Sequence, residues 1–302
     1  MRALDHLTVV DLTRYLPGPY CTRLLADVGA HVVKVEPPDG DPMRGVAWYD
    51  QLNHGKQIVT LDLRVAIDRE ALHALLAGAA VCVEGFKPAT AKAIGVDGAS
   101  LAARYPGLVH CSISGYGQSG PLADRAAHDI NYQADAGLLG ATSPPRVPGL
   151  LIADITAAHH ATIAILAALL GSQAAQHTTS AGAQRFTAAG SILDISLFDA
   201  AKSWVPFMPP PKLRGDFACY NVYETADGQW VALGALEAKF WERFCRRVDR
   251  EQWIALQFAS GVTGQELIRA VRALMRSHDL AYWTGVLGPV DCCFSAVAAP
   301  PL

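Results

Sequence analysis

A chain of 302 residues, 51% hydrophobic and 18% charged, holds enough apolar material for a sizeable core and is not expected to be disordered. Its 25 basic and 28 acidic residues give a formal net charge of -3, so no sequence-wide cationic field favours nucleic acid as a partner. An anionic small molecule would need a local basic patch, and the length allows one large domain or two of ordinary size.

The cysteines and the first residues indicate the compartment. The seven cysteines show no C-x-x-C spacing, and the adjacent Cys292 and Cys293 do not suit an ordinary disulfide. Residues 1–6 place acidic and polar groups where a secretory signal needs an apolar run. We therefore expect a reducing, cytoplasmic setting in which the cysteines are small core residues.

The first third of the chain alternates Val- and Ile-rich runs with helical segments, which is typical of βαβ units around a parallel sheet. Helices are predicted at residues 19–28 and 68–76. Strands are predicted at 7–12, 31–35, 58–63, 80–83 and 108–112. The pattern predicts an α/β fold class with an open, wound, Rossmann-like parallel sheet.

Residues 150–170 are almost wholly apolar and about long enough to span a membrane. They include Asp154, His159 and His160, each of which is costly in lipid. A buried helix of a globular domain is therefore favoured over a membrane span.

The composition changes after this helix. Residues 171–190 are mainly Ser, Thr, Gln, Ala and Gly and are predicted as a loop or mobile linker, while residues 192–198 resume a strand-like or short helical pattern. Four prolines then exclude regular structure locally, at Pro206, Pro209, Pro210 and Pro211.

A smaller unit follows the prolines. A β-hairpin is predicted over residues 220–233 with its turn at Asp227-Gly228, followed by a helix from residue 237 to about residue 248. We therefore predict an α/β domain over residues 1–205 and a second, smaller α+β domain over residues 206–302.

The run Gly115-Tyr116-Gly117-Gln118-Ser119-Gly120 matches the G-x-G-x-x-G pattern of dinucleotide-binding loops. Such a site also needs a helix that opens at the third glycine and an acidic residue after the next strand. Pro121 and the polar run to Asp129 supply neither. We interpret the segment as a flexible loop whose backbone can approach a ligand closely.

The run His128-Asp129-Ile130-Asn131-Tyr132 follows this loop and is predicted to open a helix. A residue there would lie near the free N–H groups of the helix start, where a developing enolate oxygen is stabilised. The alternative is a His-Asp pair that caps the helix on a surface loop.

Asp154 stands among apolar residues, where a carboxylate tends to be partnered or functional. Burial would raise its pKa toward a value useful for proton transfer, and the alternative is a helix cap or a buried hydrogen bond. A metal site with His159 and His160 is not expected, because adjacent histidines on a helix point in different directions.

Several motifs occur in the order found in family III CoA-transferases, the CaiB/BaiF group, and cover the first half of the chain. They are Asp11-Leu12-Thr13-Arg14 with Pro17-Gly18-Pro19, Val33-Lys34-Val35-Glu36-Pro37, His54-Gly55-Lys56 with Leu61-Asp62-Leu63, Glu84-Gly85-Phe86-Lys87-Pro88, and Ser114-Gly115-Tyr116-Gly117-Gln118-Ser119-Gly120-Pro121. The run from His128 resembles the alpha-methylacyl-CoA racemase branch in particular, because transferases usually lack that histidine. Residues 226–228, leading to residues 234–237, are similar to the racemases too.

The resemblance implies that the α/β domain binds CoA and that the substrate is an acyl-CoA thioester, with no further cofactor and no metal. His128 and Asp154 would be opposed acid/base groups flanking the α-carbon of a 2-methylacyl-CoA, and Glu237 would line the site. Asp154 also matches the nucleophilic aspartate of the transferases, which forms an acyl anhydride and then a CoA thioester.

Racemases commonly place arginines for the CoA phosphates where this chain has Pro37 and Ala93. The positive charge is therefore expected from Lys56 and Lys87, with Arg44 or Lys92. Further CoA contacts are expected at Gly85, Gly117 and Asp129.

The resemblance favours a racemase that inverts 2-methylacyl-CoA thioesters by two-base proton transfer through an enolate, as the interlocked homodimer typical of the family. One alternative is a family III CoA-transferase that moves CoA between carboxylic acids. The other is an acyl-CoA binder with impaired catalysis.

Overall fold

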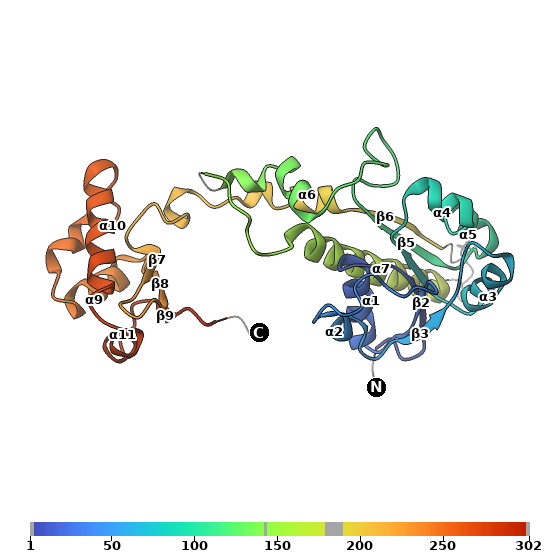
Figure 1. Cartoon of the computed structure of the whole chain (residues 1–302), viewed down its shortest axis with the longest axis horizontal. Coiled ribbons are helices and arrows are strands. Elements are labelled where there is room, and N and C mark those ends of the chain that lie inside the picture. The colour runs from blue at the N-terminus through green and yellow to red at the C-terminus, as the bar shows by residue number, and fades with distance from the viewer. Residues whose placement is uncertain (1–2, 142–143, 179–189, 300–302) are drawn as a thin grey trace. The chain divides into compact units, whose positions relative to one another are not determined.

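The computed structural model describes residues 3–141, 144–178 and 190–299. The chain divides into two compact units, Met1–Pro206 and Phe207–Leu302 (Figure 1). The first unit is built on a parallel sheet and the second on a small antiparallel sheet, so the predicted fold class is confirmed.

The sheet of the first unit has six parallel strands in the order β3-β2-β1-β4-β5-β6. The strands are β1 (Thr8–Leu12), β2 (His31–Glu36), β3 (Gln57–Thr60), β4 (Val81–Glu84), β5 (Val109–Ser114) and β6 (Ile192–Ser196). This is the strand order of doubly wound dinucleotide-binding folds. The five strands predicted in the first third of the chain are all present, with shifted ends.

Helices cover both faces of this sheet (Figure 1). They are α1 (Pro17–Asp27), α2 (Tyr49–Asn53), α3 (Ala66–Ala77), α4 (Pro88–Ile94), α5 (Gly98–Arg104), α6 (Asp129–Asp135), α7 (Ile152–Thr178) and α8 (Leu197–Lys202), with a 3₁₀ turn at Leu138–Ala141. The short helices α2, α4 and α5 were not predicted, because segments of five to seven residues show too little periodicity to be recognised.

Alternate residues of the central strands enter two separate cores. Val9 on β1 packs in the cluster that contains Leu25 of α1 and Ala157 of α7. The next residue, Val10, belongs to the opposite cluster, with Leu72 of α3. A parallel sheet covered on both faces needs apolar residues at successive positions, which explains the continuous Val-rich runs.

Helix α7 is long and apolar enough to cross a membrane by length and composition, with a mean hydropathy of 1.5 over Ile152–Gly171. Its Ala153, Ala157, Ala161 and Ile165 are fully buried in the core of the first unit. Packing within the unit therefore accounts for this apolar face, in agreement with the predicted buried helix.

The loop predicted over residues 171–190 is wrong for its first part, because α7 continues to Thr178. Ala and Gln, which dominate that part, are good helix formers. The rest of the predicted linker, residues 179–189, lies outside the described residues. Near the four prolines the chain forms only single 3₁₀ turns, at Val205–Phe207 and Pro211–Leu213.

The second unit has an antiparallel sheet in the order β7-β8-β9. Strands β7 (Tyr220–Glu224) and β8 (Trp230–Gly234) form the predicted hairpin, and β9 (Phe294–Ala296) adds to β8. The helices are α9 (Ala238–Arg247), α10 (Gly261–Met275) and α11 (Leu280–Leu287), of which only α9 was predicted. Trp241, Phe244 and Met275 are fully buried between these elements.

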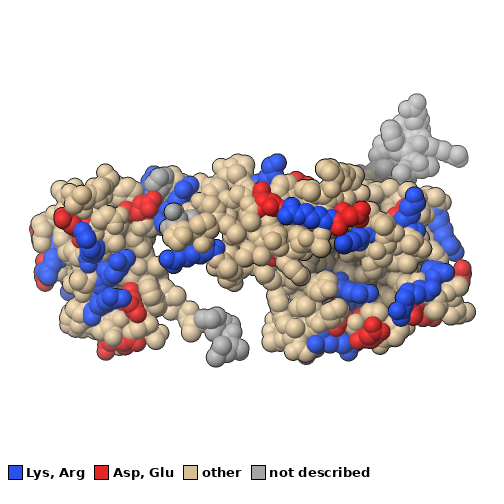
Figure 2. Space-filling model, turned by 45° about the horizontal axis from the view of Figure 1, so that its top comes forward, with Lys and Arg blue, Asp and Glu red and all other residues tan. Residues whose placement is uncertain are grey.

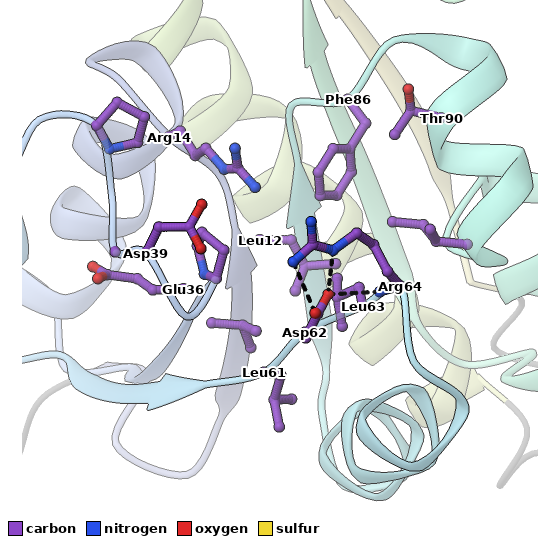
Figure 3. Close-up of a pocket in the computed structure, with 15 residues that line it drawn as sticks. Leu12, Arg14, Glu36, Asp39, Leu61, Asp62, Leu63, Arg64, Phe86 and Thr90 are labelled. Carbon is purple, nitrogen blue, oxygen red and sulfur yellow. Dashed lines mark hydrogen bonds and ion pairs between the residues drawn. The ribbon is translucent and has the colours of Figure 1, made fainter.

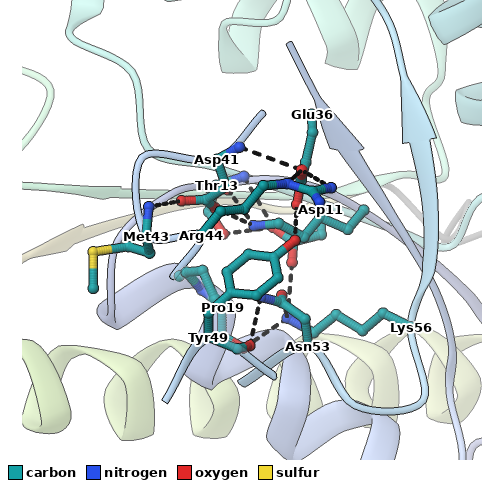
Figure 4. Close-up of polar contacts among 12 residues, drawn as sticks. Asp11, Thr13, Pro19, Glu36, Asp41, Met43, Arg44, Tyr49, Asn53 and Lys56 are labelled. Carbon is teal, nitrogen blue, oxygen red and sulfur yellow. Dashed lines mark hydrogen bonds and ion pairs between the residues drawn. The ribbon is translucent and has the colours of Figure 1, made fainter. Parts of the chain in front are cut away.

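Two buried lysines hold the loops that follow β1 and β2 (Figure 4). Lys34 on β2 is fully buried, and its Nζ donates to the Thr13 carbonyl oxygen at 2.9 Å and to Asp41 Oδ2 at 2.8 Å. Asp41 Oδ1 in turn accepts a hydrogen bond from the Met43 N–H at 2.8 Å. Lys34 therefore ties the loop after β1 to the loop after β2.

Lys56, just before β3, makes the second tie. Its Nζ donates to Asp11 Oδ2 at 3.1 Å, the Pro19 carbonyl oxygen at 2.8 Å, Thr22 Oγ1 at 2.8 Å and Asn53 Oδ1 at 3.2 Å. Burial by itself would raise the pKa of Asp11, but Lys56, Lys34 and two threonine hydroxyls lower it to about 2. The buried carboxylate is therefore ionised and anchors the start of α1.

The loop between Thr13 and Pro19, which Lys34 and Lys56 hold at its two ends, has a backbone conformation that few residues can adopt. Tyr15 has a φ of 65°, in the left-handed region that a tyrosine rarely adopts. A Cβ on Gly18 would lie 2.2 Å from the Cβ of Thr13, so only glycine fits there. Such a conformation persists only where surrounding contacts over-determine it, as the two lysine ties do here.

Asp41→Ala should destabilise the first unit by about 3–5 kcal/mol, because it leaves the Lys34 ammonium buried without its carboxylate. Chemical denaturation followed by circular dichroism measures this change. Asp27→Ala removes a partly exposed ion pair with Arg23 in the same unit and should cost about 0.5 kcal/mol or less. Equal costs for the two variants would contradict a structural role for the Lys34–Asp41 pair.

Candidate functional site

The candidate site lies at the carboxyl ends of the parallel strands, where β1 and β4 are neighbours. In the sheet, β2 lies on the side of β1 that faces away from β4, and β5 lies on the side of β4 that faces away from β1. The loops that leave β1 and β4 therefore diverge and leave a crevice between them. Ligands of open α/β sheets bind at such a switch point.

A cavity of about 940 Å³ opens at this point, and we call it the central cavity. Its walls come from the loop after β1, the ends of β4 and β5, and the starts of α6 and α7. Residues from these walls include Thr13, Gly18, Gly85, Lys87, Ser114, His128, Asp129 and Asp154. Five of the ten residues predicted for the site from sequence therefore line this one cavity, namely Gly85, Lys87, His128, Asp129 and Asp154.

Asp154 is the third residue of α7 and reaches the central cavity from the first turn of that helix. Burial raises the pKa of its carboxyl to about 7, with a further contribution from the nearby charge of Asp129. The carboxyl therefore changes its charge near neutral pH, where it can act either as a nucleophile or in proton transfer.

Asp129 is a positioning residue for Asp154. Its Oδ1 accepts a hydrogen bond from the Asp154 N–H at 3.0 Å, which satisfies a free donor at the start of α7. Its Oδ2 accepts from Gln133 Nε2, which also donates to the Leu150 carbonyl oxygen at 3.1 Å. The predicted contact between Asp129 and CoA is not tested, but both of its oxygens are already engaged within the protein.

His128 stands at the N-cap of α6, as the sequence indicated, and its exposed side chain lines the same cavity as Asp154. Its backbone N–H donates to Asn131 Oδ1 at 3.0 Å, which fixes the start of the helix. The structure therefore brings the two predicted catalytic groups of the first unit to one cavity.

Glu237, the third predicted catalytic residue, belongs to the second unit. It is the N-cap of α9, and its side chain is exposed. Its proposed place in the site stays a prediction.

Of the seven predicted CoA-binding residues, Gly85, Lys87 and Asp129 line the central cavity, and the other four do not. Lys87 Nζ donates to the Asp124 carbonyl oxygen at 3.0 Å from an exposed position. Gly117, with a φ of 86°, instead faces β6, where a Cβ would lie 3.4 Å from Asp194 Oδ2.

The structure places three predicted phosphate-binding cations away from the described cavities. The Nζ of Lys56 already donates hydrogen bonds to four acceptors within the fold, so the prediction that it meets a phosphate has no geometric support. Arg44 is held by Glu36, with its Nη2 2.7 Å from Glu36 Oε2. Lys92 is exposed in the last turn of α4.

A second cavity, about 440 Å³, lies beside the central one at the ends of β2 and β3, and we call it the outer cavity. Arg14 and Arg64 line it, and Figure 3 shows their guanidinium groups turned toward the space between them, with Phe86 alongside. Arg64 pairs with Asp62, whereas Arg14 has no hydrogen bond or ion pair among the described residues. Arg14 and Phe86 also line the central cavity.

Sequence reasoning did not single out these two arginines as candidates for ligand binding. The available signal was their position, since each stands within two residues of the end of a predicted strand, on the edge where ligands bind in such folds. Elsewhere, Figure 2 shows basic and acidic side chains interspersed on the face in view of the first unit. A free arginine at the ligand-binding edge is therefore a local feature of the kind that an anionic ligand requires.

The sequence matches CoA-transferase family III over residues 4–301. The chain belongs to CoA-transferase family III. It is similar to a succinyl-CoA–D-citramalate CoA-transferase of Chloroflexus aurantiacus, with 33% identity over 78% of this chain and 62% of the relative. A succinyl-CoA:mesaconate CoA-transferase of Haloarcula hispanica is 30% identical over 95% of this chain and 76% of the relative.

Solved structures of this family share the fold. A CaiB/BaiF family protein from Brucella suis superposes with a TM-score of 0.78 at 26% identity, covering 98% of this chain and 84% of its own. The family is thereby shown, and the relatives named here are transferases. The racemase branch favoured from the sequence is not shown, and the transferase alternative is better supported.

The pKa of Asp154 has a consequence for stability. A carboxyl with a raised native pKa binds its proton more tightly when folded, so its contribution to stability falls as pH rises from about 4 to about 7. Asp154→Asn avoids this loss of stability, because its amide does not ionise. The variant should therefore melt higher than wild type at pH 8, by about 2–4 °C for each kcal/mol recovered, with a smaller gain at pH 4.

Differential scanning fluorimetry at the two pH values measures this difference. Asp5→Asn, at a position that is 56% exposed, serves as the matched control and should melt like wild type at both. An Asp154→Asn variant that gains nothing at pH 8 would show that the carboxyl is not destabilised by burial.

Proposed function

We propose that this protein is a CoA-transferase that moves CoA between two carboxylic acids through a covalent intermediate on Asp154. The observation that carries the proposal is a carboxyl with a pKa near 7 at the strand-end cavity of a family III fold. Relatives named as CoA-transferases support it. The partner is an acyl-CoA thioester.

The chemistry asks Asp154 to act as a nucleophile. Its carboxylate attacks the thioester carbonyl of the donor, forms a mixed anhydride and releases CoA as a thiolate. The thiolate attacks the Asp154 carbonyl, which forms an aspartyl-CoA thioester and frees the donor acid. The acceptor carboxylate then attacks that thioester, and CoA returns to the acceptor acyl group, which restores the Asp154 carboxylate.

The environment of Asp154 suits these steps. The half-buried carboxylate of Asp154 is less solvated than one in water, which makes it a better nucleophile, yet a pKa of about 7 leaves much of it ionised at neutral pH. Asp129 holds the Asp154 backbone and keeps α7 in place while the side chain reacts.

The outer cavity supports binding of the nucleotide end of CoA. Arg14 presents a guanidinium to the cavity, and Phe86 offers an aromatic face beside it. Guanidinium groups bind phosphate through several N–H donors, and aromatic rings stack on bases. Since Arg14 and Phe86 line both cavities, a CoA whose nucleotide occupies the outer cavity extends toward Asp154.

One observation favours a second candidate, the racemase. His128 lines the same cavity as Asp154, as a two-base proton transfer at the α-carbon of a 2-methylacyl-CoA requires. The interlocked homodimer and the cytoplasmic setting expected from the sequence stay predictions.

The two candidates differ in what they ask of His128 and Asp154. During transfer, hydroxylamine should trap an acyl or CoA adduct on Asp154 in the wild type, and mass spectrometry of the peptide identifies it. Asp154→Asn should abolish both the adduct and the transfer, whereas His128→Ala should retain the adduct and much of the turnover.

The racemase predicts the opposite pattern. His128→Ala would then lower inversion by about 10²–10⁴-fold, with α-deuterium exchange in heavy water and no adduct on Asp154. That result would overturn the transferase proposal.

A further inference from the structure

A third cavity, about 750 Å³, opens between α1, α2 and the first turn of α7, and we call it the side groove. Its apolar lining consists of Leu16, Tyr20, Trp48, Leu52 and Ile155. Neither the motifs of the sequence nor the proposed transfer chemistry assigns a role to this groove.

The side groove adjoins the central cavity. Leu16 and Trp48 line both of them, so these two side chains form the shared wall. Ile155 in the groove directly follows Asp154 on α7. A group attached to a carbonyl at Asp154 therefore meets the groove as soon as it passes Leu16 and Trp48.

The charge at the rim of the groove indicates the kind of group that fits. Arg23 lies at the rim, but its Nε is 2.7 Å from Asp27 Oδ1 and its Nη1 donates to the Gln51 carbonyl oxygen at 2.7 Å. Asp50 adds a negative charge at the same edge. A second carboxylate at the end of an acyl group would meet a neutralised arginine and an extra acid, so a dicarboxylic acyl group is disfavoured.

We propose that the side groove binds the alkyl chain of the acyl group, and that the protein selects acyl-CoA thioesters with an apolar chain. The inference rests on the proposed function, because it takes the thioester carbonyl to lie at Asp154. Leu16 and Trp48 are then specificity-determining residues at the entrance, and Leu52 and Tyr20 contact the chain beyond it.

Calorimetric titration with butyryl-, hexanoyl-, octanoyl- and decanoyl-CoA tests this inference by binding alone. With the wild type, the Kd should fall by about two- to fourfold for each methylene that enters the groove. Binding of butyryl-CoA provides the reference for the CoA part of the ligand in every variant.

Two variants alter the groove in different ways. Gln51→Trp adds bulk at an exposed rim position and leaves the backbone carbonyl that holds Arg23 in place. Leu52→Gln makes the lining polar without adding bulk. Both should flatten the dependence of Kd on chain length and leave the Kd of butyryl-CoA within about twofold. Ile163→Gln, on the exposed side of α7 outside the groove, should bind the whole series like wild type.

The outcomes separate this inference from the proposed function. A wild-type Kd that is independent of chain length, or a dependence that survives both groove variants, would overturn the groove assignment alone. A change of oligomeric mass in Gln51→Trp with no change in chain-length dependence would assign the groove to a second copy of the chain and would also overturn it. Chain-length-dependent binding without any CoA transfer would contradict the proposed function and uphold the groove.

Discussion

The buried charges of Lys34 and Lys56 are the constraint on which the rest of the site depends. Each ammonium is removed from water and compensated by a carboxylate and by backbone or side-chain oxygens. Residues of the two loops they hold line the central cavity, the outer cavity and the side groove. Breaking one of these pairs would leave a buried charge unpaired, so the loops are fixed far more firmly than surface loops usually are.

The second constraint is the pairing of two acids at the start of α7. Asp129 accepts a hydrogen bond from the Asp154 N–H, which stabilises the helix start, but its charge also opposes ionisation of the Asp154 side chain. The position of this poorly solvated carboxyl at the cavity therefore lowers the stability of the fold at neutral pH. Such a conflict between stability and local chemistry is expected at a functional site rather than at a structural one.

Much of the fold was predictable from the sequence, because a buried parallel strand leaves a continuous Val-rich run such as that around Val9 and Val10. Asp154 was predictable because a carboxylate among apolar residues is rare. The hydrogen bonds that hold Lys56 within the fold could not be predicted, because three of its four acceptors, on Asp11, Pro19 and Thr22, come from distant parts of the chain. The free Arg14 was missed for the same reason, since only the folded structure distinguishes a paired cation from an unpaired one. Local sequence patterns indicate which residues are buried and which secondary structure they form, but they do not indicate which residues a side chain contacts.

The central claim is that Asp154 carries the acyl and CoA groups covalently, and oxygen isotopes test it most directly. In the proposed steps, the acceptor carboxylate leaves one of its oxygens on Asp154 when CoA returns to the acceptor acyl group. Turnover with an acceptor acid labelled with ¹⁸O in its carboxylate should therefore place ¹⁸O in the peptide that contains Asp154, as detected by mass spectrometry. CoA transfer that proceeds at the full rate with no label in that peptide would contradict the account.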